Sequence, residues 1–112
     1  MIFFNRGGSK VGLIGTLDDL KYFLNKNNVN KDEFGRKLWY AIRMALRLTK
    51  HTTDKATYDD ILNLIAFYVT DGDRSVAVLV SQFIDAYLGA VKGLGEEEYK
   101  YFDEVVFYYL KK

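Results

Sequence analysis

The chain contains no cysteine and no proline, and only one histidine occurs among its 112 residues. Without cysteine it can form no disulfide framework, no Cys-based zinc site and no thiol nucleophile. The absence of disulfides favours a reducing cytoplasm. The longest apolar stretch begins at Val76 and is interrupted by Ser81 and Asp85, well short of the roughly 20 residues that a bilayer span requires. We therefore expect neither a secretion signal nor a membrane helix.

The single histidine leaves little material for catalysis. His51 falls in a predicted loop, and no arrangement of nucleophile, base and orienting group is evident around it. Asp71 and Asp73 flank Gly72, but two carboxylates without calcium-loop spacing are more typical of a turn and a helix cap. Residues 7–10 lack the spacing of a phosphate-binding loop. The sequence therefore predicts a protein that is not an enzyme and has no cofactor and no metal.

Charge is distributed unevenly along the chain. The net charge is only +1, yet residues up to Lys50 carry ten basic and four acidic side chains, whereas residues from His51 carry six basic and eleven acidic ones. Either the two halves attract each other within the fold, or they present faces of opposite sign. Apolar residues make up 49% of the sequence without any low-complexity block, so we expect one ordered domain over residues 1–112.

Helix start signals recur along the chain. Thr16, Asn30 and Thr57 are each followed three positions later by a carboxylate, and such pairs can cap the orphan N–H groups of a first helical turn. With the apolar spacing that follows, they predict helices over 16–26, 31–49 and 54–69. A fourth helix over 74–92 is apolar nearly all round, which is typical of the centre of a bundle.

A fifth helix is predicted from Glu96 to the C-terminus, with acid at its start and base at its end. The first fifteen residues, with a turn-prone stretch at 5–8, predict a short hairpin or extended segment. The sequence thus predicts an all-α, compact five-helix bundle with a short N-terminal extended segment or hairpin. One alternative is a β-hairpin over residues 65–80, since this stretch is rich in β-branched residues around a turn. Helical spacing continuing through Val91 favours helices.

The predicted second helix has a basic face. At about 100° per residue, five side chains fall within roughly 80° opposite its apolar stripe. These are Arg36, Tyr40, Arg43, Arg47 and Lys50, and Trp39 flanks them. Basic residues among aromatics can pair with phosphates and stack on bases, or bind a carboxylate-rich protein. The alternative is a solvated face whose arginines pair with the acidic second half of the chain.

The predicted fifth helix offers another surface. Its core-facing side chains are expected to be Tyr99, Phe102, Val105, Val106, Tyr109 and Leu110. Tyr101, Phe107 and Tyr108 then remain for a partner, because aromatic side chains supply large contact area at interfaces. Alternatively, neighbouring helices cover this helix on two sides. The adjacent carboxylates Asp103 and Glu104 point about 100° apart on a helix and are expected to be solvated.

These features favour a small cytoplasmic protein-binding regulator or inhibitor that occupies a partner's surface and can form a dimer. Its size and helical class are shared with phage-encoded inhibitors and bacteriocin-immunity proteins, an analogy of class alone. The alternative is a nucleic-acid-binding protein. Residues 17–27 and 29–40 resemble the two helices of a helix-turn-helix, with the basic helix in the reading position but without the glycine-containing turn.

Overall fold

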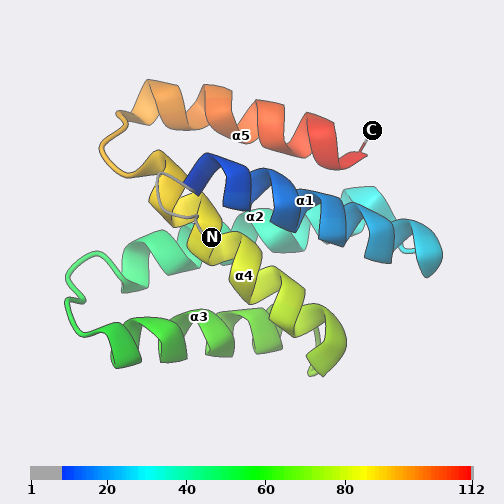
Figure 1. Cartoon of the computed structure of the whole chain (residues 1–112), viewed down its shortest axis with the longest axis horizontal. Helices are drawn as coiled ribbons and strands as arrows, with labels where there is room; N and C mark the ends of the chain where they lie inside the picture. The colour runs from blue at the N-terminus through cyan, green and yellow to red at the C-terminus, as the bar shows by residue number, and fades with distance from the viewer. Residues whose placement is uncertain (1–8, 112) are drawn as a thin grey trace.

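The computed structural model describes residues 9–111, and within that range it contains five α-helices and no strand (Figure 1). The helices are α1 (Ser9–Lys26), α2 (Lys31–Leu48), α3 (Lys55–Val69), α4 (Arg74–Val91) and α5 (Glu96–Lys111). The predicted five-helix bundle is confirmed. The alternative β-hairpin over 65–80 is wrong, because these residues form the end of α3, a turn and the first part of α4.

The N-terminal helix begins earlier than its capping signal predicts. Residues 9–15 belong to α1 and are not extended, and Thr16 is an interior residue whose hydroxyl donates to the Leu13 carbonyl at 2.8 Å. The reason is packing, because buried leucines recur at helical spacing at positions 13, 17, 20 and 24. Their burial outweighs the low helix propensity of Gly12 and Gly15. The part of the predicted hairpin or extended segment that falls on residues 1–8 lies outside the described residues.

Side-chain caps set the starts of three helices. The Asn30 side chain accepts from the Glu33 N–H, as the sequence predicts. In α3 the cap is Asp54, which accepts from the Thr57 N–H at 2.9 Å, so Thr57 is a capped residue and not itself the cap. Asp73 caps α4 by accepting from the Ser75 N–H. Each carboxylate or amide satisfies a donor that the first helical turn leaves unpaired.

The turn between α3 and α4 depends on left-handed backbone. Asp71 has φ +54° and Gly72 has φ +81°, a region that glycine adopts without the steric cost that a Cβ imposes. The Gly72 N–H donates to the Phe67 carbonyl at 2.9 Å. This turn and the Asp73 cap explain the Asp71 to Asp73 segment, which the sequence assigns to a turn and cap.

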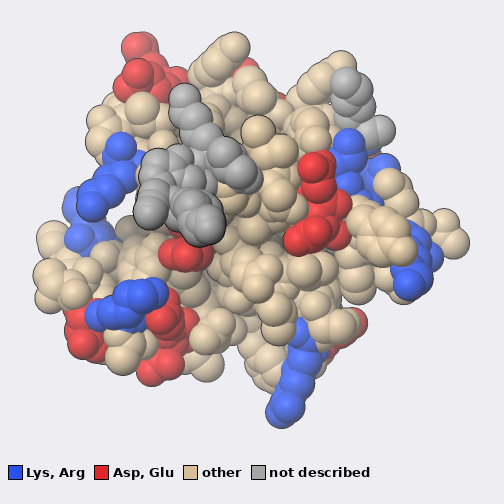
Figure 2. All heavy atoms as spheres, viewed as in Figure 1, with Lys and Arg blue, Asp and Glu red and all other residues tan. Residues whose placement is uncertain are grey.

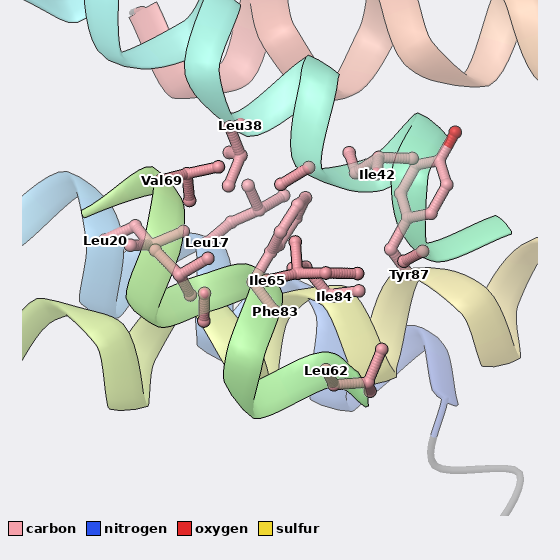
Figure 3. Packing of buried hydrophobic residues seen from close by; sticks show 14 of the residues in the cluster. Leu17, Leu20, Leu38, Ile42, Leu62, Ile65, Val69, Phe83, Ile84 and Tyr87 are labelled. Carbon is pink, nitrogen blue, oxygen red and sulfur yellow. The ribbon is translucent and has the colours of Figure 1, made fainter. Parts of the chain in front are cut away.

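The core is built around α4, which crosses the bundle in Figure 1. It packs most extensively against α1, next against α3, and also contacts α2. Phe83, Ile84 and Tyr87 are fully buried, and Figure 3 shows Phe83 and Ile84 amid apolar side chains from neighbouring helices. This agrees with the central position that the apolar character of residues 74–92 predicts.

Length and composition alone would also let α4 cross a membrane. A helix in the core of a soluble protein meets the same criterion, and seven residues of α4 are buried inside the fold. These are Val76, Ala77, Val80, Phe83, Ile84, Tyr87 and Val91. Packing against α1 and α3 accounts for the apolar character of this helix.

Candidate functional site

Among the side chains that the structure describes, one charged group is buried in the core, and it comes from α5. Asp103 is 5% exposed, accepts a hydrogen bond from the Tyr87 hydroxyl and forms an ion pair with Arg43. The prediction that Asp103 is solvated is therefore wrong, whereas its neighbour Glu104 is exposed as expected. The helical offset of about 100° between adjacent residues separates the two carboxylates. Asp103 shares the inward side of α5 with Val106 and Leu110.

Arg43 and Tyr87 reach Asp103 from different helices. Figure 3 shows the Tyr87 hydroxyl directed away from the apolar residues around Phe83. Burial raises the pKa of Tyr87, and the hydrogen bond to the Asp103 carboxylate raises it further, so this hydroxyl remains a donor. The Arg43 guanidinium lies 3.9 Å from the centre of the Trp39 ring, and its Nε has no hydrogen-bond partner among the described residues. The group ties α2, α4 and α5 together.

This pairing supports the alternative in which the basic half of the chain binds its acidic half. Arg43 pairs with Asp103, and Lys37 pairs with Asp71 at 3.4 Å. The side chain of Arg43 is only 31% exposed, so it is not the free surface cation of the predicted basic face.

The remaining basic face of α2 is divided between two hollows. Arg36 and Tyr40 line a hollow of about 410 Å³ toward the end of α3, together with Lys37, Tyr68, Val69 and Asp71. Arg47 and Lys50 line a larger cleft at the other end of α2. The residues of the predicted basic face therefore line two separate hollows, at opposite ends of the helix.

Near the smaller hollow, apolar side chains from two helices are exposed. Tyr40 of α2 is 58% exposed, and Leu64, Phe67 and Tyr68 of α3 are 69%, 46% and 68% exposed. Leu64 and Tyr68 are four residues apart and therefore neighbours on one helix face, while Tyr40 and Tyr68 line the same hollow. We call these four residues the α2–α3 patch. The apolar spacing of the third helix consists of Ile61, Leu62, Leu64, Ile65 and Tyr68. The sequence misses the patch because it groups Leu64 and Tyr68 with this apolar side, whereas both are exposed.

The larger cleft has a volume of about 1000 Å³ and lies where four helix ends meet. It is lined by Arg43, Leu46, Arg47, Thr49, Lys50, Tyr58, Asp85, Leu88, Gly89, Val91, Lys92, Gly93 and Tyr99. We call it the basic cleft, because four of these side chains are cationic and one is acidic. Burial, together with the Asp85 carboxylate, raises the pKa of Tyr58 to about 12. Sequence reasoning finds Arg47 and Lys50 but not the residues of α4 and α5.

Another exposed group lies on α5. Tyr101 and Tyr108 are each 71% exposed, so the prediction that they lie outside the core-facing stripe is confirmed. Val105 is 48% exposed and shares their face, within an arc of about 60°, so its predicted core position is wrong. Phe107 is half-buried, with its ring 3.8 Å from the Cβ position that a side chain at Gly35 of α2 would occupy. We call Tyr101, Val105 and Tyr108 the α5 stripe.

Catalytic and metal-binding features are sparse in the part of the chain that the structure describes. His51 is exposed, and residues 9–111 contain no group of three or more His, Asp or Glu side chains placed to hold a metal ion. Comparisons with protein-family models, curated proteins and solved structures found no match.

Proposed function

We propose that this chain is a small protein-binding regulator or inhibitor that acts by occupying the surface of a partner protein. The observation that supports this most directly is the α2–α3 patch, in which four large apolar side chains from two adjacent helices remain exposed. Single exposed apolar residues are ordinary, whereas contiguous groups of them are typical of interaction sites. The patch is therefore the proposed primary contact.

The energetics of the patch fit a binding surface. Burying a leucine or phenylalanine side chain contributes about 1.5–3 kcal/mol relative to leaving it exposed, and tyrosine is frequent among residues that dominate interface energies. Leu64 and Tyr68 keep more than two thirds of their surface in solvent. The adjoining hollow adds Arg36 and Asp71 at its edge, a polar rim of the kind that surrounds interface cores.

The α5 stripe is the proposed second contact. Two tyrosines at 71% exposure flank Val105 on the solvent side of this helix, so an opposing helix can pack against all three at once. A specific interface normally covers about 800 Å² on each partner. Three side chains are too few for that area, so the stripe is proposed as an additional anchor.

The alternative of nucleic-acid binding receives less support from the geometry. In that alternative α2 is the helix that reads the nucleic acid. Its Arg43 is paired with Asp103, and its Arg36 and Arg47 line different hollows. In addition, α1 packs mainly on α4, whereas α2 packs on α3 and α5. This arrangement differs from the packed helix pair of a helix-turn-helix.

Affinity capture with matched surface variants tests the proposal. The tagged chain is used on a lysate of its native host, split into nuclease-treated and untreated halves, beside the double variant Leu64→Asp/Tyr68→Asp. Tyr22→Asp is the control, because Tyr22 and Tyr68 are both 68% exposed but lie on different helices. Circular dichroism checks folding, and light scattering of the purified protein detects a dimer.

We expect a stoichiometric protein that survives nuclease, binds the Tyr22→Asp control and is lost from the double variant. Self-association that the double variant abolishes would also support the proposal, with a second copy as the partner. Capture that depends on intact nucleic acid would contradict it, and so would a protein partner held equally by wild type and the double variant. The variant Tyr101→Asp/Tyr108→Asp applies the same test to the α5 stripe.

A further inference from the structure

The basic cleft combines four cations with an apolar and aromatic lining. Arg43, Arg47, Lys50 and Lys92 line it together with only one carboxylate, Asp85. The ends of α2 and α4 and the starts of α3 and α5 converge here, at the left in Figure 1. Figure 2 shows Lys and Arg side chains along that edge, over the loops that join α2 to α3 and α4 to α5.

Three of these cations are available to a ligand. Arg47, Lys50 and Lys92 are exposed and form no ion pair with another described side chain, whereas Arg43 is held by Asp103. The C-terminal ends of α2 and α4 carry partial negative charge, which allows cations to gather in a small space. Counted by side chains, the cleft therefore has a net positive charge even after Arg43 is set against Asp103.

The single carboxylate of the cleft, Asp85, affects the ionisation of Tyr58. Burial, together with the negative charge of Asp85, holds the pKa of Tyr58 at about 12. Tyr58 therefore stays protonated at neutral pH. An anion entering the cleft meets three cations that form no ion pair with another described side chain, and one carboxylate.

The rest of the lining suits a flat or apolar group. Leu46 and Leu88 are half-buried in the cleft wall, and Tyr58 and Tyr99 contribute aromatic rings from α3 and α5. A volume of about 1000 Å³ is at the upper end of the range for small-molecule sites. It far exceeds what one inorganic phosphate fills, so the charge alone does not account for the shape of the cleft.

We propose that the basic cleft binds an organic phosphate of nucleotide size. Its phosphates would pair with Arg47, Lys50 and Lys92, because a guanidinium fork and ammonium groups bind phosphate oxygens through charge-assisted hydrogen bonds. Its planar group would lie against the wall formed by Tyr58, Tyr99 and the leucines, where aromatic rings stack on bases. This site is separate from the α2–α3 patch, so the two proposals stand or fall independently.

Isothermal titration calorimetry with ADP as the probe tests this site. Adenosine and pyrophosphate provide the base and the charge separately. The variants are Arg47→Glu and Lys92→Glu, and the matched control is Lys26→Glu. Lys26 is exposed and is the last residue of α1, the end of that helix that lies away from the cleft in Figure 1. Circular dichroism establishes that each variant is folded.

ADP is expected to bind one site and to bind more tightly than either adenosine or pyrophosphate. Each cleft variant should weaken ADP binding by at least about tenfold, the loss of one charge-assisted contact, while Lys26→Glu changes it less than about twofold. Leu64→Asp/Tyr68→Asp should leave it unchanged.

Three results would overturn the site. The first is the absence of saturable ADP binding to the folded protein. The second is equal binding of pyrophosphate and ADP, because the aromatic wall would then contribute nothing. The third is ADP binding that Arg47→Glu and Lys92→Glu leave intact. A single-stranded oligonucleotide and a polyglutamate peptide are titrated in parallel, and preference for either over ADP would also reject it.

Discussion

Replacing Asp103 with alanine is the sharpest test of how the helices are held together. The substitution leaves the buried Tyr87 hydroxyl without its acceptor and the Arg43 guanidinium without its carboxylate. Removing one partner of a buried ion pair costs about 3–5 kcal/mol, and a buried hydroxyl left unsatisfied costs about 1–3 kcal/mol. Because the Arg43 side chain is 31% exposed, water replaces part of its lost contact, and we expect a total of about 3 kcal/mol.

Tyr87→Phe separates the two contributions. It removes the hydroxyl and keeps the buried ring, so we expect a loss of about 1 kcal/mol. In the double variant Asp103→Ala/Tyr87→Phe the orphaned hydroxyl is gone, so the combined loss should fall short of the sum by about 1 kcal/mol or more. Glu104→Ala, next to Asp103 but exposed, is the control and should change stability by less than about 0.5 kcal/mol.

Urea denaturation followed by circular dichroism measures these free energies of unfolding. A loss of 3 kcal/mol is large beside the roughly 5–15 kcal/mol by which a domain of this size is stable. The reasoning fails if Asp103→Ala costs no more than Glu104→Ala. It also fails if the two core substitutions are additive, since the Tyr87 hydroxyl would then not depend on Asp103.

Three other measurements test particular elements of the fold. Gly72→Ala should lower the free energy of unfolding by about 1 kcal/mol or more, because Gly72 has a positive φ. Gly15→Ala should raise it by up to about 1 kcal/mol, because no heavy atom lies within 4 Å of the added Cβ. A change of the same sign in both variants would contradict this reasoning. The hydrogen bonds from Ser75 lower the pKa of Asp73, the cap of α4. The ionised carboxylate therefore stabilises the fold above its pKa in the unfolded chain, and this stabilisation is lost as the pH falls through its pKa in the folded protein. Asp73→Asn should therefore reduce the acid sensitivity of unfolding. The difference between ultraviolet titrations of the wild type and Tyr58→Phe should show Tyr58 ionising near pH 12, and Asp85→Asn should lower that value. No change in Asp85→Asn would remove Asp85 as a cause.

Much of the fold follows from local signals in the sequence. Helical spacing and the caps at Asn30 and Asp73 depend on neighbours within one or two turns, so α2 and α4 are predicted to within about two residues. The all-round apolar character of α4 likewise predicts its place at the centre of the bundle. The start of α1 is missed, because only the burial of Leu13 against other helices outweighs its glycines.

The candidate sites depend on which helix lies beside which, and periodicity within one helix does not contain that information. The sequence by itself determined that Arg43 lies on the polar side of α2, that Tyr101 and Tyr108 lie off the apolar side of α5, and that the chain has too few ligands for a cysteine or multi-histidine metal site. Only the tertiary structure decided that Asp103 is buried with Arg43 and Tyr87, and that four helix ends enclose a basic cleft. The physical reason is that a charge is stable inside a protein only beside a partner, and both partners of Asp103 are contributed by other helices.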